Sequence, residues 1–144
     1  MASPRNLRAL QVGTALADGS IYAGFSPTTA KPLFTAATDR IVKAGDVGLA
    51  AMTSVEHGLL DWRAPSYEEL KQLFDVHEAG ALKDTFNNTG GAYTSYYATS
   101  DITTNGMSDA DFMRVRMIGK GDAHFPAERL LPLIYPVTLR LVRG

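Results

Sequence analysis

The sequence contains no cysteine, and this absence excludes three kinds of chemistry at once. A chain without thiols forms no disulfide, offers no thiolate to a metal ion and supplies no cysteine nucleophile. Its stability must therefore come from packing and hydrogen bonds. The sequence also has no run approaching about 18 apolar residues, the length that a membrane-spanning helix needs, so we expect no membrane insertion.

A strong net charge is missing as well. Fourteen lysines and arginines oppose fifteen aspartates and glutamates, which leaves a formal net charge of −1 and no overall field to attract nucleic acid. We therefore expect no nucleic-acid partner. Residues 1–8 carry two arginines but are followed by no continuous apolar segment of the kind that a signal peptide contains. This pattern predicts a protein made in the cytoplasm without a signal peptide.

The chain does have enough apolar material for one core. With 144 residues, of which 45% are hydrophobic, it is long enough for one globular domain and too short for two. We place this domain at residues 9–144. Residues 1–8 form an N-terminal tail or an arm that docks on a partner, and the sequence leaves both options open.

Apolar periodicity and turn signals predict an α+β fold with short antiparallel sheets, two short helices and long loops. Asp18-Gly19 between apolar runs is a hairpin signal, and Ser66 with Glu69 three positions later is a capping box that starts a helix. The predicted strands lie near 10–16, 20–25, 33–35, 93–98, 112–118 and 136–144, and the predicted helices cover 46–55 and 67–75.

The last strand alternates in the manner of a half-buried strand. Its pattern places Val137, Leu139 and Leu141 on one face and Thr138 and Arg140 on the other. A Gly-rich stretch earlier in the chain, GKGDAHF at residues 119–125, is typical of a hairpin turn.

A succession of motifs resembles a known domain family. DGSIYAGFSPTTAKPLFTAATD, a helix, DWRAPSYEELKQLF, a Tyr/Ser/Thr-rich segment and a terminal LRLVRG are similar to the family typified by the C-terminal domain of the bacterial collagen-like adhesin Lcl. The likeness runs from about Asp18 to Arg143. The aromatic strand departs from the pattern, because YYATS at residues 96–100 stands where the family usually has Trp-Ser-Ser.

The resemblance implies a C-type-lectin-like fold, in which the amino and carboxyl strands lie near each other and long loops present a variable surface. It also implies a structural motif in the stretch before the second helix. Trp62 would be a core anchor rather than a ligand contact, Arg63 would tie carbonyls or an acidic neighbour such as Glu69, Pro65 would end the extended segment, and Ser66 would cap the helix.

Catalytic and metal-binding signals are weak. His57, His77 and His124 stand in no metal-binding spacing, and Asp122 with His124 fits the hairpin turn better than acid/base work. The calcium-binding motifs of classical C-type lectins are not found. We therefore expect no catalytic residue, no metal site, no cofactor and no enzymatic activity.

The remaining candidate is a surface rich in tyrosine and short polar side chains. Such a composition is typical of adaptable recognition surfaces. The candidate ligand or partner residues are Tyr93, Tyr96, Tyr97, Asp101, Thr103 and Asn105. Because neighbouring strand residues point to opposite faces, Tyr96 or Tyr97 should instead belong to the core.

These observations favour a non-enzymatic interaction module. The leading hypothesis is a phage or phage-like virion component, such as a spike, fibre or decoration protein, that contacts a host-surface glycan or protein. Its partners would be other virion or assembly subunits, and we expect a homo-oligomer. Two alternatives stay open: a purely structural head, tail or baseplate subunit without an outside ligand, and a free binding domain of the adhesin type.

Overall fold

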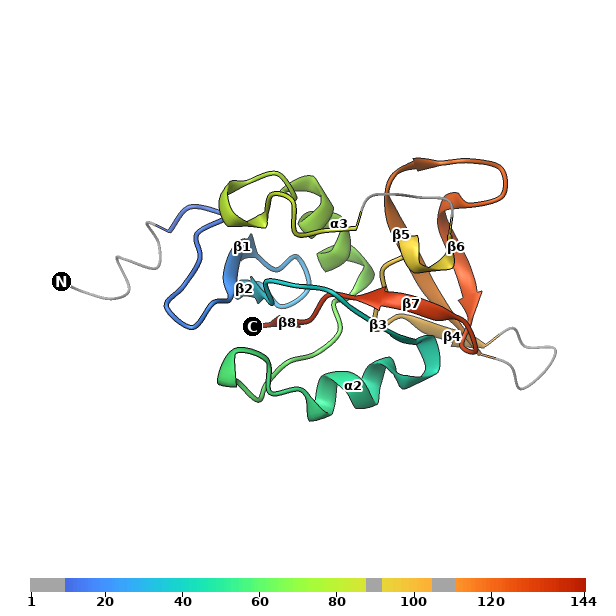
Figure 1. Cartoon of the computed structure of the whole chain (residues 1–144), viewed down its shortest axis with the longest axis horizontal. Coiled ribbons are helices and arrows are strands. Elements are labelled where there is room, and N and C mark those ends of the chain that lie inside the picture. The colour runs from blue at the N-terminus through green and yellow to red at the C-terminus, as the bar shows by residue number, and fades with distance from the viewer. Residues whose placement is uncertain (1–9, 88–91, 105–110) are drawn as a thin grey trace.

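The computed structural model describes residues 10–87, 92–104 and 111–144 (Figure 1). Over these ranges the chain is a mixed fold of short antiparallel sheets and two α-helices, which confirms the predicted α+β class. The expected tail at residues 1–8 lies outside the described residues. Within them, no helix is both long enough and apolar enough to cross a membrane.

The elements follow one another in a mixed order. The strands are β1 (Ile21–Phe25), β2 (Pro32–Thr35), β3 (Arg40–Lys43), β4 (Ile102–Thr104), β5 (Asp111–Gly121), β6 (Pro126–Pro132), β7 (Pro136–Leu139) and β8 (Val142–Arg143). The α-helices are α2 (Val47–Thr53) and α3 (Tyr67–Asp75). Short 3-10 turns lie at Ala44–Asp46, Glu56–Gly58, Gly80–Leu82 and Tyr93–Ser95.

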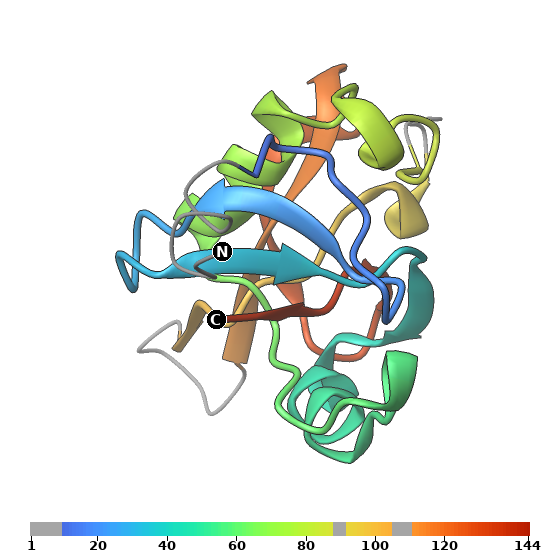
Figure 2. The ribbon, with the colours of Figure 1, turned by 90° about the vertical axis from the view of Figure 1, so that its left-hand side faces the viewer.

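One sheet brings the end of the chain beside its first strands. Its order is β1-β2-β8, with both pairs antiparallel, and Figure 2 shows the three strands side by side. The backbone of Arg63 pairs with Val142 on the other side of β8, through two hydrogen bonds of 2.8 and 2.9 Å. The last strand is therefore held from both sides.

The remaining strands form two groups that one residue joins. β3 pairs with β7, and β4, β5 and β6 form a meander with β5 in the middle. Tyr97 bridges both groups, because its backbone pairs antiparallel with Arg116 of β5 and parallel with Thr138 of β7. The strand predicted at 93–98 is extended only in its second half, around Tyr97. Its first half, Tyr93–Ser95, is a 3-10 turn.

Helix α3 begins and ends where the capping pattern predicts. The Ser66 hydroxyl accepts from the Glu69 N–H at 3.1 Å, and the Glu69 carboxylate accepts from the Ser66 N–H at 2.9 Å. The helix buries Leu70 and Leu73 in a small core with Tyr97 and Val142. A larger core lies between α2 and the β5–β6 hairpin.

Two further predicted strands need correction. Near 10–16 only Ala15 forms a bridge, to Ile21, because the chain turns at Gly13, whose φ of +96° no extended strand adopts. The turn at Asp18-Gly19 is present: the Leu16 N–H donates to the Ser20 carbonyl at 2.8 Å.

The terminal strand is also different from the prediction. It is split into β7 and β8, and Thr138 and Arg140, expected on a polar face, are as buried as Leu139. Sheets that are covered on both faces do not show a polar face, so the alternation misplaced these two side chains.

Candidate functional site

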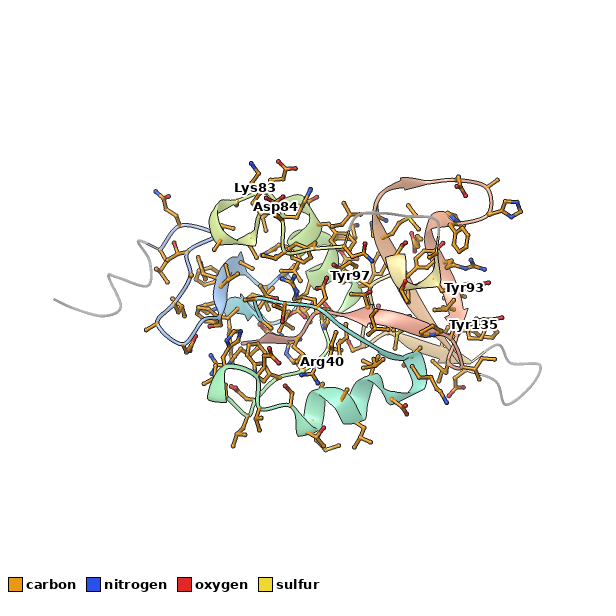
Figure 3. All side chains as sticks on the ribbon, viewed as in Figure 1. Arg40, Lys83, Asp84, Tyr93, Tyr97 and Tyr135 are labelled. Carbon is orange, nitrogen blue, oxygen red and sulfur yellow. The ribbon has the colours of Figure 1, made fainter. Side chains whose placement is uncertain are left out.

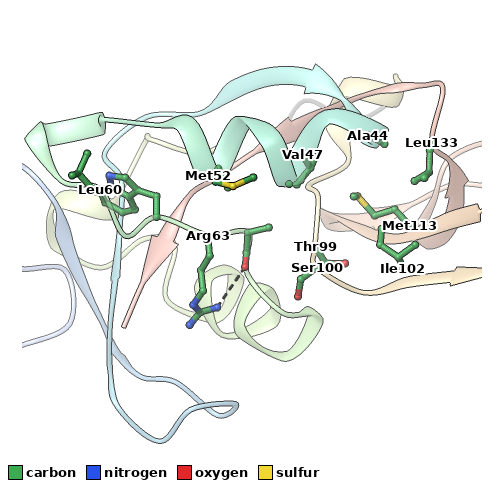
Figure 4. A pocket seen from close by; sticks show the side chains of 15 residues that line it. Ala44, Val47, Met52, Leu60, Arg63, Thr99, Ser100, Ile102, Met113 and Leu133 are labelled. Carbon is green, nitrogen blue, oxygen red and sulfur yellow. Dashed lines mark hydrogen bonds between the residues drawn. The ribbon is translucent and has the colours of Figure 1, made fainter.

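A groove with a volume of about 610 Å³ lies beside α2 (Figure 4). We call it the α2 groove. The helix forms one wall, the segment before α3 forms another, and residues just ahead of β4 form the third. It is lined by Ala44, Gly45, Val47, Gly48, Ala51, Met52, Leu60, Trp62, Arg63, Ala64, Thr99, Ser100, Ile102, Met113 and Leu133.

The groove exists because the helical wall is built from small residues. Ala44, Gly45, Gly48 and Ala51 all line it, so the helix side fills little of the space between itself and the sheet. At Gly48 even an added Cβ atom would meet nothing within 4 Å. Val47 and Ala51 are buried and fasten the helix to the core. The sequence thus anchors α2 and leaves the space beside it open.

The rim of the groove is apolar and exposed. Met52 is 72% exposed, Leu60 is 75% exposed and Ile102 is 47% exposed. Single exposed aliphatic side chains are ordinary, but three of them around one concave surface are typical of a contact site. The polar groups in the lining are few, since Arg63, Thr99 and Ser100 are its only side chains with a nitrogen or oxygen atom apart from the Trp62 indole.

Trp62 forms the inner end of this surface. Its side chain is buried, and its indole Nε1 donates to the Glu56 carbonyl at 2.8 Å. The His57 ring lies against it with centroids 6.0 Å apart. The burial confirms the expected core position of Trp62. The same side chain also lines the α2 groove, which the sequence alone did not indicate.

Arg63 and Glu69 form a paired contact that fixes the wall. The two guanidinium nitrogens each donate to one carboxylate oxygen of Glu69, both at 2.7 Å, and one also donates to the Gly144 carbonyl at 2.9 Å. The Ser26 hydroxyl donates to the same carboxylate at 2.5 Å. The expectation that Arg63 ties an acidic neighbour is confirmed. Pro65 is buried and directly precedes the N-cap residue Ser66.

The Glu69 carboxylate stays ionised although it is fully buried. Burial is the largest single influence and by itself raises the pKa, but the hydrogen bonds from Arg63, Ser26 and the Ser66 backbone together outweigh it. The pKa of Glu69 therefore lies below its ordinary value of 4.5. The Arg63–Glu69 ion pair therefore holds α3, the end of β8 and the groove wall in fixed positions.

Arg140, which is completely buried between β7 and β8, holds the loop between β2 and β3 and the segment around Thr85. Arg140 donates to the Asp39 carboxylate at 2.8 Å and to the Ala36 carbonyl at 3.1 Å, and it also bonds the carbonyl of Thr85. Its guanidinium carbon lies 3.9 Å from the centre of the Phe86 ring. All of these partners belong to the same chain, so Arg140 is part of the framework.

Tyr96 and Tyr97, two of the proposed surface tyrosines, are completely buried. The Tyr97 hydroxyl donates to the Asp39 carboxylate at 2.5 Å, and burial together with that nearby charge raises its pKa. The Tyr96 hydroxyl donates to the Pro126 carbonyl at 2.7 Å. The expectation that one of these rings is core holds for both, because residues 96–98 run between two other strands. Figure 3 shows Tyr97 inside the molecule.

The other proposed surface residues do not gather into one site. Tyr93 is half-buried and stacks on Tyr135, with ring centroids 4.5 Å apart, at the end of the molecule that carries the β5–β6 hairpin (Figure 3). Asp101 is half-buried and Thr103 is exposed, both next to the α2 groove wall. Asn105 lies outside the described residues.

The histidines have local structural partners. The His57 Nε2 accepts from the Ala37 N–H at 3.2 Å, and the His77 Nδ1 lies 2.6 Å from the Phe74 carbonyl. His124 is exposed in the turn between β5 and β6, where the predicted hairpin is confirmed. Across the described ranges, no three histidine or acidic side chains come together as a metal site.

Sequence reasoning missed the residues that shape the groove. Met52 and Leu60 were not singled out, although Met52 lies off the buried stripe of its helix and Leu60 stands in an apolar pair with Leu59 before the tryptophan motif. Such off-stripe aliphatic residues are the only signal that the sequence offers. The groove itself depends on contacts between distant segments.

Comparison with protein-family models and with curated proteins finds no match for this chain. Function therefore has to follow from the site.

Proposed function

We propose that this chain is a non-enzymatic interaction module that binds another protein through the α2 groove. One observation carries the proposal: a concave apolar surface whose rim exposes Met52, Leu60 and Ile102 on an otherwise well-packed domain. Covering this rim would remove apolar surface from water, at roughly 25 cal/mol for each Å². Concave apolar surfaces with a few polar groups are where proteins most often bind partners and ligands.

A protein partner suits the surface better than a glycan. Sugars are commonly held by exposed aromatic faces and polar groups, whereas the groove rim is aliphatic. Two of the three tyrosines predicted as ligand or partner residues are buried and offer no ring face to a sugar. The third, Tyr93, already stacks on Tyr135 and meets the edge of Phe125. Aliphatic side chains of a second protein fit the groove with no such competition.

Three carboxylates with lowered pKa values are not suited to act as general acids near neutral pH. Asp61 and Glu128 have lowered pKa values, chiefly through the hydrogen bonds from Arg143 and Arg114 respectively, and Glu69 is held by Arg63. A general acid that works near neutral pH needs the opposite shift. These carboxylates serve the framework, as struts between elements.

The setting we propose is a phage or phage-like virion component with a C-type-lectin-like fold, of the Lcl C-terminal-like kind. The likeness in motifs supports it, as does the position of β8 beside β2, which puts the last strand in the same sheet as the first two. The cysteine-free composition suits assembly in a reducing cytoplasm. Its groove partner would then be another assembly subunit or a host-surface protein.

The proposal is tested by separating extracts of producing cells by density gradient and size exclusion. The wild-type chain is compared with Leu60→Asp in the groove and Leu130→Asp as a control, since Leu130 is 52% exposed. Leu130 pairs with Arg114 in β5, so it lies on the face opposite to the groove residue Met113.

We expect the wild type and Leu130→Asp to migrate with a large assembly and Leu60→Asp to migrate alone. Free migration of the wild type would count against the virion setting and leave the adhesin-type binding domain. Equal behaviour of all three chains inside an assembly would contradict the use of the groove.

A further inference from the structure

We infer that the groove partner enters as an extended segment that adds to the free edge of β4. This inference rests on the proposed use of the α2 groove by a protein. It adds the form of the partner: a strand with large aliphatic residues at alternate positions and with basic residues beside them. Strand addition uses backbone hydrogen bonds for affinity and side-chain pockets for selectivity.

The hydrogen-bond register leaves β4 with outward-facing backbone groups. The Arg114 N–H donates to the Asp101 carbonyl at 2.9 Å, which makes the pair just before β4 a hydrogen-bonded one. Antiparallel pairs alternate, so the next pair, Ile102 with Met113, is of the non-hydrogen-bonded kind. The N–H and C=O of Ile102 therefore point away from β5. The same holds for the backbone of Thr104, opposite Asp111.

The side of β4 away from β5 pairs with no strand in the described part of the chain. Two residues before β4 the edge is covered, because the Ser100 N–H donates to the Pro65 carbonyl at 2.8 Å. There the chain turns away into α3. A partner strand beside Ile102 would continue the line that the segment up to Pro65 begins.

The opposite edge of the same meander, strand β6, carries residues that protect a sheet edge against strand addition. β6 has a proline at each end, Pro126 and Pro132, and the charged residues Glu128 and Arg129 between them. Prolines and charges at an edge discourage strand addition. β4 has none of these, since its three residues are Ile102, Thr103 and Thr104, all β-branched.

The groove-lining side chains and the outward-facing backbone groups of β4 lie at the same place. Ile102 and Met113 are directly paired, so their side chains share one face of the sheet, and both line the α2 groove. A residue opposite Ile102 on an added strand would lie on that face, about 5 Å away, over the groove. Its aliphatic side chain would cover Ile102 and reach toward Met52.

The charges near this edge select a basic partner. Asp111 lies opposite the end of β4, and Asp46 stands between the groove-lining residues Gly45 and Val47. Neither carboxylate makes an ion pair within the described residues; Lys43 is likewise unpaired, and Arg63 is neutralised by Glu69. Asp101 precedes β4 on the opposite face, beside Arg114, and does not count toward the groove. The unpaired charges around the groove are thus acidic in excess, which favours lysine or arginine on the incoming segment.

The test uses a random library of 12-residue peptides, selected for binding to the purified full chain and counted again after selection on Leu60→Asp. We expect enriched peptides with large aliphatic residues at every second position and an excess of Lys and Arg. Their affinity for Leu60→Asp should fall at least about tenfold, with no loss for Leu130→Asp.

The spacing of the enriched residues decides between the proposals. Aliphatic residues spaced three and four apart would indicate a helix in the groove, which would overturn strand addition and leave the groove as a protein site. Enrichment that is equal on the wild type and on Leu60→Asp, or none at all, would overturn both.

Backbone pairing is then measured directly with the best peptide. Methylating its backbone nitrogens at alternate positions keeps every side chain but removes the donors, and we expect binding to weaken about ten- to hundredfold. In amide hydrogen exchange, the Ile102 N–H should become protected on binding, while the inward-facing Thr103 N–H should be protected in both states. Equal binding of the methylated peptide, with unchanged exchange at Ile102, would rule out strand addition.

Discussion

At the scale of single residues, Trp62 both supports the core and shapes the site. Its ring is buried and its Nε1 is bonded to the Glu56 carbonyl. We expect Trp62→Ala to lower the free energy of unfolding by about 3–5 kcal/mol, because it removes a large buried ring and leaves a cavity. Chemical denaturation measures this, with Trp62→Phe as the milder control. A denaturation midpoint equal to that of the wild type would show that the ring is not a core anchor.

Glu69 gives a second prediction at this scale. Glu69→Gln keeps the shape of the helix cap but leaves the Arg63 guanidinium without its counter-charge, and we expect a loss of about 2–4 kcal/mol at neutral pH. Glu68→Gln, on the exposed face of the same helix, should change stability by less than about 0.5 kcal/mol. Equal effects of the two substitutions would contradict a stabilising role of the Arg63–Glu69 ion pair.

The same carboxylate predicts a pH dependence. The pKa of Glu69 is lower in the folded chain than its ordinary value of 4.5, so the unfolded chain binds its proton first as the pH falls. The stabilisation is fully present above pH 4.5 and is lost as the pH falls through the folded-state pKa. The difference in unfolding free energy between the wild type and Glu69→Gln should therefore shrink in acid. If this difference in unfolding free energy stayed constant from pH 7 to pH 3, the lowered pKa of Glu69 would be contradicted.

At the scale of elements, Arg140 ties the stretch between β7 and β8 to the loop between β2 and β3. Arg140→Met removes the cation beside Asp39 and leaves that carboxylate without its strongest partner. We expect a loss of about 3–5 kcal/mol, part of which Arg140→Met with Asp39→Asn should recover, because the unpaired charge is then gone. Thermal or denaturant unfolding of Arg140→Met, Asp39→Asn and the double variant measures these losses. Additive losses in the double variant would exclude the coupling.

The elements also show what the sequence could predict. Helix α3 was predicted to the residue because its signal is local: Ser66, Glu69 and the apolar stripe all lie within ten positions. The strand near residues 93–98 was only half right because what makes Tyr97 extended is pairing with Arg116 and Thr138, which are distant in the sequence. Local periodicity does not contain that information.

The candidate site was harder to predict for the same reason. The core position of Trp62 and the Arg63–Glu69 contact were implied by the family resemblance of the motif, and the structure has both. The α2 groove arises where small residues of the helix come opposite Met113, about sixty positions later. Burial of Tyr96 and Tyr97 likewise follows from strands on both sides, so composition alone placed them on a surface they do not reach.

At the scale of the whole molecule, the groove rim should contribute to binding and not to folding. Met52 and Leu60 are more than two-thirds exposed, so Met52→Asp with Leu60→Asp should change the unfolding free energy by no more than about 1 kcal/mol. The same double variant should lose partner binding. A large drop in thermal stability would mean that these side chains belong to the packed core after all.

The most direct measurement is site-specific photo-cross-linking in cells that produce the protein. A photoreactive phenylalanine analogue replaces Leu60 in one chain and Leu130 in another, and adducts are identified by mass spectrometry. We predict a discrete protein adduct from position 60 and none from position 130, and an adduct with a second copy of this chain would identify the groove as a subunit contact. Identical adducts from both positions, or none from position 60, would contradict binding through the α2 groove.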